Sequence, residues 1–143
     1  AVLAAEEEGL AGLERLSGIP GFLGGAVRGN AGAFGAEISS NLITVTVVNL
    51  RSGILKVFTK NECDFSYRSS FFKNNKDWAI ISAEFVFKEH QSSDKLASIR
   101  KDTVAKREEK HPQDAWCAGS FFMNPIVTTH NQLDEFEAET GHP

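Results

Sequence analysis

The sequence has few cysteines and no local pattern that would pair them. Cys63 and Cys117 are the only two among 143 residues, and neither belongs to a CxxC pair or to a cluster with histidine. A disulfide scaffold and a zinc site are therefore disfavoured, although a bridge between the two thiols stays open as an alternative. No metal site is expected. Two reduced thiols are typical of a cytosolic protein, so we expect a cytoplasmic location.

Positive charge and long apolar runs are also lacking. The chain has 15 basic and 19 acidic residues, a net charge of −4, whereas nucleic-acid binding requires a basic surface. No apolar run approaches the roughly 20 residues that span a bilayer. The N-terminus lacks the basic start and apolar stretch of a signal peptide. We therefore expect no nucleic-acid or membrane partner. The absent initiator Met suggests that the chain begins inside a longer protein.

What the sequence does contain predicts an α+β fold. A hydrophobic fraction of 41% can form the core of one domain, or of one domain with part of a second. β-Branched and alternating patterns predict strands at 42–50, 54–59 and 79–88, and in the third strand Ile81, Ala83, Phe85 and Phe87 are expected on the buried face. Helices are predicted at 1–8, at 92–110 and at 131–139, the last ended by Gly141. No alternating βαβ rhythm is present, which disfavours a doubly wound parallel sheet.

Seven of the twelve glycines lie in one run, GIPGFLGGAVRGNAGAFG, at 18–35. Because interior glycines cost about 0.5–1 kcal/mol each in a helix or strand, this density predicts a shaped loop instead. A ligand-free surface loop is one interpretation. The interleaved Ile19, Pro20 and Phe22 favour the other, a loop whose backbone approaches a cofactor. No strand precedes the run, so it does not meet the dinucleotide fingerprint.

Three further segments contain candidate chemistry. In NECDFSYRSSFFK, at 61–73, Arg68 is either a surface cation lying on a ring or a partner for a carboxylate. In AGSFFMNP, at 118–125, Ser120 is either a turn residue or a proton donor. REEKHP, at 107–112, is most simply a solvated helix end. None of the three decides a function by itself.

Taken in order, these segments resemble the UDP-N-acetylenolpyruvoylglucosamine reductase family. The family pattern GLExLxGIPGxxGGAxxxNxGAxG appears as GLERLSGIPGFLGGAVRGNAGAFG, ECxFxYRxSxFK as ECDFSYRSSFFK, and GSFFKNP as GSFFMNP. The resemblance implies a flavoenzyme fold of the vanillyl-alcohol-oxidase/PCMH type, an antiparallel sheet with helices. Residues 1–110 would form its second FAD-binding subdomain, and 111–143 the beginning of the substrate-binding domain.

The resemblance also implies an activity. NADPH is the reductant, FAD the cofactor, and UDP-N-acetylglucosamine enolpyruvate the substrate, reduced to UDP-N-acetylmuramate for peptidoglycan synthesis. Ser120 would be the proton donor, and Arg68 would bind the substrate carboxylate and stabilise the developing enolate. Tyr67, Lys110 and Asn124 would contact the substrate. The flavin would lie against Gly18, Ile19, Pro20, Gly21, Gly24, Gly25, Asn30, Gly32 and Ala33.

The family pattern also includes parts that this sequence lacks. A first flavin subdomain would precede Ala1, and a catalytic glutamate would follow Pro143. Met123 stands where a lysine is usual, and Phe34 where a tyrosine is common. We therefore expect the 143 residues alone to be inactive. A non-catalytic flavin- or nucleotide-binding module and an inactive truncated product remain the alternatives.

Overall fold

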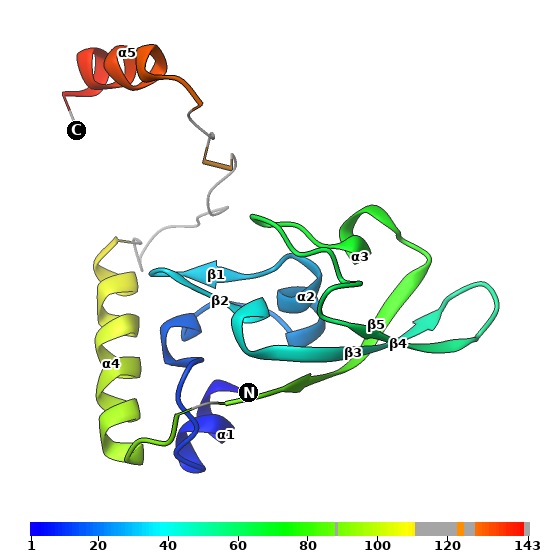
Figure 1. Cartoon of the computed structure of the whole chain (residues 1–143). Helices are drawn as coiled ribbons and strands as arrows, with labels where there is room; N and C mark the ends of the chain where they lie inside the picture. The colour runs from blue at the N-terminus through cyan, green and yellow to red at the C-terminus, as the bar shows by residue number, and fades with distance from the viewer. Residues whose placement is uncertain (88, 111–122, 125–127, 142–143) are drawn as a thin grey trace.

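The computed structural model describes residues 1–87, 89–110, 123–124 and 128–141. Short helical turns and two small antiparallel sheets precede two longer helices (Figure 1). In chain order the elements are α1 (Val2–Glu7), η1 (Glu14–Leu16), α2 (Leu23–Arg28), β1 (Gly32–Ala33), β2 (Ala36–Glu37), η2 (Ile38–Asn41), β3 (Leu42–Asn49), β4 (Leu55–Thr59), α3 (Phe71–Asn74), β5 (Trp78–Phe85), α4 (Ser93–Lys110) and α5 (His130–Thr140).

The main sheet has three antiparallel strands in the order β4-β3-β5. Its central strand is rich in β-branched residues, which fit a pleated and half-buried surface. Val45 pairs with Phe58 of β4 and with Ala83 of β5, and both Val45 and Val47 are fully buried. Leu55 and Val57 on β4 remain more than half exposed. One face of the sheet therefore builds the core, and the other is open among the described residues.

An aromatic cluster closes the core beneath this sheet. The ring of Phe58 lies 5.1 Å from Phe71, 5.2 Å from Phe72 and 5.7 Å from Trp78, measured between ring centroids. Phe72 is fully buried, and the two edge-on pairs have the geometry that aromatic rings prefer. The cluster fixes the segment that leads from Arg68 into α3 against the sheet.

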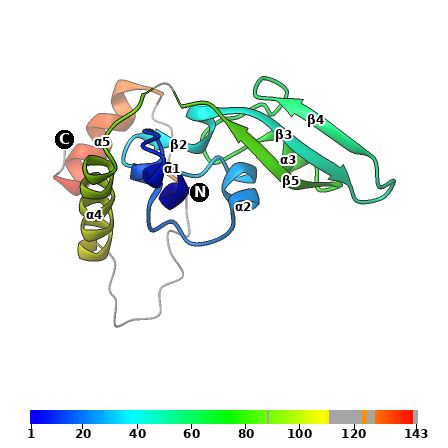
Figure 2. The same cartoon turned by 90° about the horizontal axis from the view of Figure 1, so that it is seen from below.

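Helix α4 stands beside the N-terminal segment (Figures 1 and 2). Leu96 is fully buried, and Arg100 forms an ion pair with Glu6 of α1 at 2.6 Å. Ser92 accepts a hydrogen bond from the Lys95 amide, which makes it the N-cap. This helix therefore spans the predicted residues and places its last turn near η1.

The helix predicted at 131–139 is confirmed as α5. Thr129 caps its N-terminus by accepting a hydrogen bond from the Gln132 amide, and Gly141 ends it in the left-handed conformation. All of its residues from His130 to Thr140 are exposed. The signals that predicted this helix are local, and they require no contact with a neighbouring element.

Two predictions were wrong in detail. The glycine run is not entirely loop, because Leu23–Arg28 forms α2 and the hairpin β1–β2 follows it. Helix α2 packs on β5, with Gly24 facing Ile80 at an ordinary contact distance of 3.7 Å from a built Cβ, and this packing offsets the low helix propensity of glycine. The predicted alternation in β5 fails at Ile81, which is 57% exposed, because a register shift opposite Thr46 and Val47 turns its side chain outward.

Candidate functional site

Asn30 lies at the centre of the site, two residues before β1. Its side chain is 1% exposed, and its Nδ2 donates to Glu37 Oε2 and to the Ser66 carbonyl, both at 3.0 Å. Its Oδ1 accepts a hydrogen bond from the Ser39 amide at 3.4 Å. One buried amide therefore joins the glycine-rich segment to the turn that contains Tyr67 and Arg68.

Arg68 reaches the same hairpin from that turn. Its Nη2 donates to the Gly32 carbonyl at 2.6 Å, and its guanidinium lies 4.8 Å from the centroid of the Tyr67 ring. A Cβ built on Gly32 would lie only 2.8 Å from Arg68 Nη1. Only glycine at this position lets the guanidinium lie directly over the β1 backbone, so the two motifs are matched to each other.

The backbone around this contact is strained. Arg68 has a φ of +54°, Asn30 of +43° and Phe34 of +50°, and all three surround the β1–β2 hairpin. Among the described residues only Asp64 is another non-glycine residue with positive φ. Such conformations cost about 1–3 kcal/mol each and concentrate where a site must be held in one geometry. This strain identifies the hairpin and the Tyr67–Arg68 turn as a candidate functional site.

The surrounding hydrogen bonds fix the turn at both ends. The amides of Ser66 and Ser69 each donate to the other's carbonyl at 3.1 Å, which leaves Tyr67 and Arg68 as a two-residue loop. The buried Ser70 hydroxyl donates to the Arg28 carbonyl, and Lys73 Nζ to the Arg68 carbonyl, each at 2.7 Å. Arg68 is therefore positioned by contacts that begin on α2 and α3.

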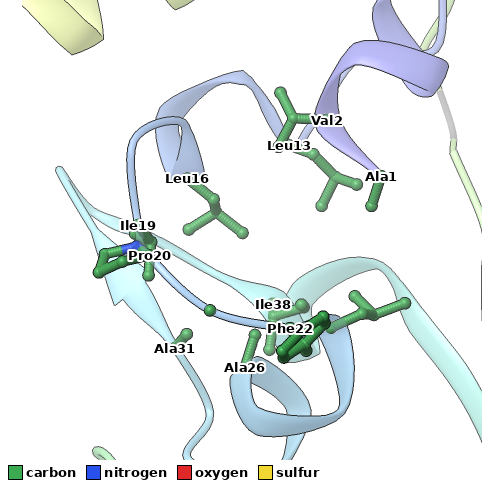
Figure 3. A pocket seen from close by; sticks show the side chains of 12 residues that line it. Ala1, Val2, Leu13, Leu16, Ile19, Pro20, Phe22, Ala26, Ala31 and Ile38 are labelled. Carbon is green, nitrogen blue, oxygen red and sulfur yellow. The ribbon is translucent and has the colours of Figure 1, made fainter.

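An apolar cavity of about 200 Å³ lies beside the first part of the glycine run (Figure 3). Its lining includes three of the predicted cofactor residues, Ile19, Pro20 and Gly21, and also Ala1. Its other walls are Val2, Leu13, Leu16, Phe22, Leu23, Ala26, Ala31 and Ile38. Ligand pockets commonly measure about 300–1,000 Å³, so this cavity can hold only part of a dinucleotide.

The remaining predicted residues lie around or outside this arrangement. Gly21 and Gly25 have no atom within 4 Å of a built Cβ, so their surfaces are open to a ligand. Lys110 ends α4, and Asn124 is exposed. Ser120 lies outside the described residues. The structure thus brings together the glycine run and Arg68 and leaves the position of Ser120 untested.

Glu37 and Ser66 contribute to the site, but no sequence pattern distinguished them from their neighbours. Both act through Asn30, and Ser66 is 36 positions distant from it along the chain. Their residue types are ordinary for a hairpin and a turn, so only the fold reveals the connection.

The described part of the chain contains neither a metal-ligand cluster nor a membrane-spanning helix. No group of three or more histidine, cysteine or acidic side chains there is arranged to hold a metal ion. No described helix is both long and apolar enough to cross a membrane.

Known proteins resemble the chain over most of its length. It is 42% identical over 124 residues to the UDP-N-acetylenolpyruvoylglucosamine reductase of Solibacter usitatus, which covers 87% of this chain and 39% of that protein. It is 48% identical over 117 residues to the reductase of the same name from Carboxydothermus hydrogenoformans, covering 82% and 38%. No protein-family model matches the chain.

A solved structure agrees with these sequence relatives. The crystal structure of UDP-N-acetylenolpyruvylglucosamine reductase (MurB) from Thermus caldophilus superposes with a TM-score of 0.73 at 28% identity, covering 96% of this chain and 49% of that one. The α+β fold with antiparallel sheets therefore matches part of a reductase. The chain is a MurB (UDP-N-acetylenolpyruvoylglucosamine reductase) homologue, and it spans about two fifths of the length of the curated relatives that it matches.

Proposed function

We propose that this chain provides flavin- and substrate-binding parts of an FAD-dependent, NADPH-using reductase. The substrate is UDP-N-acetylglucosamine enolpyruvate, the product is UDP-N-acetylmuramate, and the reaction belongs to cytoplasmic peptidoglycan synthesis. One observation carries the proposal beyond family likeness. The Arg68 guanidinium is fixed on the Gly32 carbonyl, beside Asn30, so a carboxylate-binding cation adjoins the proposed cofactor segment.

The residues present fit part of a flavin site. The cavity at Ile19, Pro20 and Gly21 is apolar, as a planar aromatic ligand requires, and Gly21 has no atom within 4 Å of a built Cβ. The volume is smaller than a dinucleotide needs, which agrees with a chain that spans part of its relatives. When bound, FAD would provide the hydride-transfer chemistry that links NADPH to the enolpyruvyl double bond.

The protein side chains have separate roles in this proposal. Arg68 binds the substrate carboxylate and stabilises the charge that develops as hydride adds to the double bond. Its left-handed backbone and its bond to Gly32 hold the guanidinium in place before substrate arrives, so little reorganisation is needed. Ser120 donates the proton that completes the reduction, and Tyr67, Lys110 and Asn124 contact the substrate.

The two-part organisation belongs to the same proposal. Residues 1–110 form the second FAD-binding subdomain, and residues 111–143 begin the substrate-binding domain. All of the described sheet strands and the cavity fall in the first part. The short second part contributes α5 and the segment that contains Ser120.

A chimera tests the proposal. This chain replaces the aligned segment of the Solibacter usitatus relative, and NADPH oxidation is followed at 340 nm with and without the enolpyruvyl substrate. Substrate-dependent oxidation supports the proposal. A folded chimera that retains FAD without substrate-dependent oxidation supports a non-catalytic flavin module instead. A folded chimera that loses FAD points to an inactive product.

A further inference from the structure

Glu37, on β2, lies beside Arg68 without pairing with it. The two side chains flank Gly32, because the position of a Cβ built on Gly32 is 2.8 Å from Arg68 Nη1 and 3.0 Å from Glu37 Cγ. No ion pair within the described part of the chain includes either residue. The half-buried Glu37 carboxylate instead accepts a hydrogen bond from Asn30 Nδ2 at 3.0 Å. This carboxylate therefore has a role other than neutralising the guanidinium.

The contact between Glu37 and Asn30 determines which way the buried amide points. Asn30 Nδ2 has two N–H groups, and it donates them to the Glu37 carboxylate and to the Ser66 carbonyl. Asn30 Oδ1 accepts a hydrogen bond from the Ser39 amide. A reversed amide would bring its oxygen against the two acceptors and its nitrogen against an N–H donor. Because Asn30 is 1% exposed, water is unable to restore the lost bonds, so Glu37 helps to hold a single orientation.

The orientation of this amide affects Arg68 through Ser66. Ser66 begins the two-residue loop, whose ends are joined by mutual backbone hydrogen bonds between Ser66 and Ser69. Within the loop, Arg68 takes a left-handed conformation, and its Nη2 donates to the Gly32 carbonyl at 2.6 Å. Gly32 in turn is the cross-strand partner of Glu37 in the β1–β2 hairpin. These contacts form a closed ring that begins and ends at Glu37, so displacing its carboxylate disturbs both supports of Arg68.

We propose that Glu37 is a positioning residue for Arg68 and that it acts through the hydrogen bond that it accepts from Asn30. The inference rests on the proposed function, in which Arg68 binds the substrate carboxylate. While Asn30 engages Glu37, Arg68 Nη1 forms no hydrogen bond among the described residues. The guanidinium therefore keeps a donor for an external carboxylate, which its rigid fork is suited to bind.

Two conservative variants separate the hydrogen bond of Glu37 from its negative charge. Glu37→Gln removes the charge and keeps an oxygen that can accept from Asn30 Nδ2, whereas Glu37→Asp keeps the charge on a side chain one methylene shorter. In the chimera, Glu37→Asp should raise the KM for the enolpyruvyl substrate by about tenfold or more and lower kcat, because misplaced groups lose rate steeply. Glu37→Gln should stay within about threefold, since a neutral acceptor keeps part of the bond.

A matched control distinguishes positioning from a general loss of structure. Glu84→Asp shortens another strand carboxylate that accepts a side-chain hydrogen bond, from Thr44 Oγ1 at 2.6 Å on the main sheet, and it should change neither constant. A variant that only reduces the folded fraction lowers kcat and leaves KM unchanged. An unchanged KM in Glu37→Asp, or a Glu37→Gln as damaging as Glu37→Asp, would overturn the inference.

A second measurement keeps the inference testable if the proposed function fails. That failure would be seen as a chimera, without further substitution, that shows no substrate-dependent oxidation of NADPH. The Arg68 Nε–H signal of the 143-residue chain, observed by NMR, then reports the position of the guanidinium directly. Glu37→Asp should shift this signal, and Glu37→Gln should shift it less. Equal shifts in both variants, or no shift in either, would contradict the role assigned to Glu37.

Discussion

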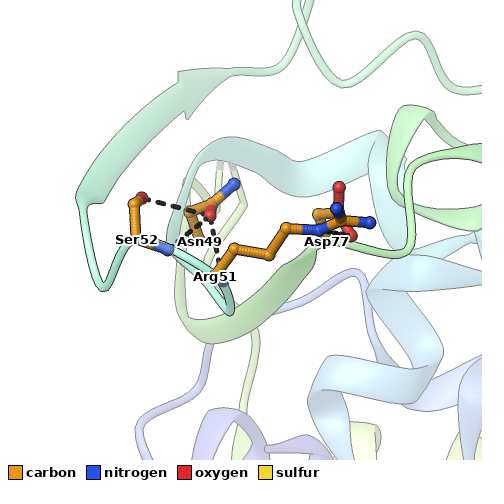
Figure 4. Close-up of polar contacts among 4 residues, drawn as sticks. All are labelled: Asn49, Arg51, Ser52 and Asp77. Carbon is orange, nitrogen blue, oxygen red and sulfur yellow. Dashed lines mark hydrogen bonds and ion pairs between the residues drawn. The ribbon is translucent and has the colours of Figure 1, made fainter.

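Two turns of this protein satisfy their polar groups in opposite ways. The turn between β3 and β4 is complete in itself: Asn49 Oδ1 accepts hydrogen bonds from the amides of Arg51 and Ser52 and from the Ser52 hydroxyl (Figure 4). Arg51 adds an ion pair with Asp77 at 2.9 Å. Gly53 takes the positive φ, at +73°. This turn needs nothing further to be stable.

The region around the β1–β2 hairpin differs in each of these respects. There Asn30, Phe34 and Arg68 take left-handed conformations in addition to Gly35. Its contacts join residues far apart in the chain, and Arg107 Nη2 and the Ser17 hydroxyl remain unpaired. Structures store strain and unsatisfied groups of this kind where a ligand completes the arrangement. The turn between β3 and β4 therefore has the features of a purely structural turn, whereas the region around the β1–β2 hairpin has those expected of a ligand site.

Replacing the buried asparagine should have the largest effect on stability. Asn30→Ala removes three hydrogen bonds and leaves the Ser66 carbonyl without its donor, so we expect a loss of about 3 kcal/mol in the free energy of unfolding. Asn49→Ala, in the exposed turn, should cost about 1 kcal/mol. Urea unfolding of both variants measures the difference, and equal losses would remove the contrast between the regions.

Two glycines of the same run should respond with opposite signs. At Gly32 a Cβ would lie 2.8 Å from the Ala36 carbonyl oxygen and from Arg68 Nη1, so Gly32→Ala should destabilise by about 2 kcal/mol. At Gly25, inside α2, a Cβ meets nothing within 4 Å, so Gly25→Ala should stabilise by about 0.5–1 kcal/mol. Thermal unfolding checks both signs. A stabilising Gly32→Ala would contradict the close approach of Arg68 to β1.

The buried thiol gives a pH-dependent prediction. Burial raises the pKa of Cys63 to about 11 from its ordinary 9.0, and the nearby charge of Glu62 adds to the rise. The unfolded chain loses this proton first, so the contribution of Cys63 to stability should be constant below pH 9 and fall as the pH rises toward 11. In a Cys117→Ser background, Cys63 should also resist thiol reagents at pH 8 until the chain unfolds. Rapid labelling of the folded chain would contradict its burial.

The smallest effect on stability is expected for Glu62, just after the end of β4. Hydrogen bonds from the Thr59 amide and then from its hydroxyl, each 2.9 Å long, lower the pKa of the exposed Glu62 from 4.5. The stability from these bonds is present above pH 4.5 and is lost as the pH falls through the lowered pKa. Glu62→Gln should flatten this slight acid dependence in a stability–pH profile. An unchanged profile would show that the carboxylate contributes nothing measurable.

Local sequence signals correctly predicted the strands, turns and helix ends that depend only on neighbouring residues. The strands 42–50 and 54–59, the turn at Gly53 and the helix ending at Gly141 each depend on β-branching or a terminal glycine, which act over a few residues. Prediction from the sequence failed where a contact between residues far apart in the chain determines the local structure. Helix α2 forms despite its two glycines because it packs on Ile80. In β5, a register shift turns the side chain of Ile81 outward.

The candidate site was predicted only in part, for the same reason. Arg68 and Asn30 followed from the family motifs, but neither their common contact with the β1–β2 hairpin nor the role of Glu37 was visible in the sequence. Arg107 resembled an ordinary basic residue at a helix C-terminus. Its position over Gly18 depends on how α4 packs beside η1, which no local pattern encodes.

Hydrogen exchange in the chimera, with and without FAD, tests most directly the claim that one region is built for a ligand and the other is not. We predict that FAD slows amide exchange across residues 18–35 and leaves the turn at 49–54 unchanged, because only the first region has unmet donors and an adjoining cavity. Bound FAD that protects neither region, or protects 49–54 as strongly as 18–35, would contradict this account.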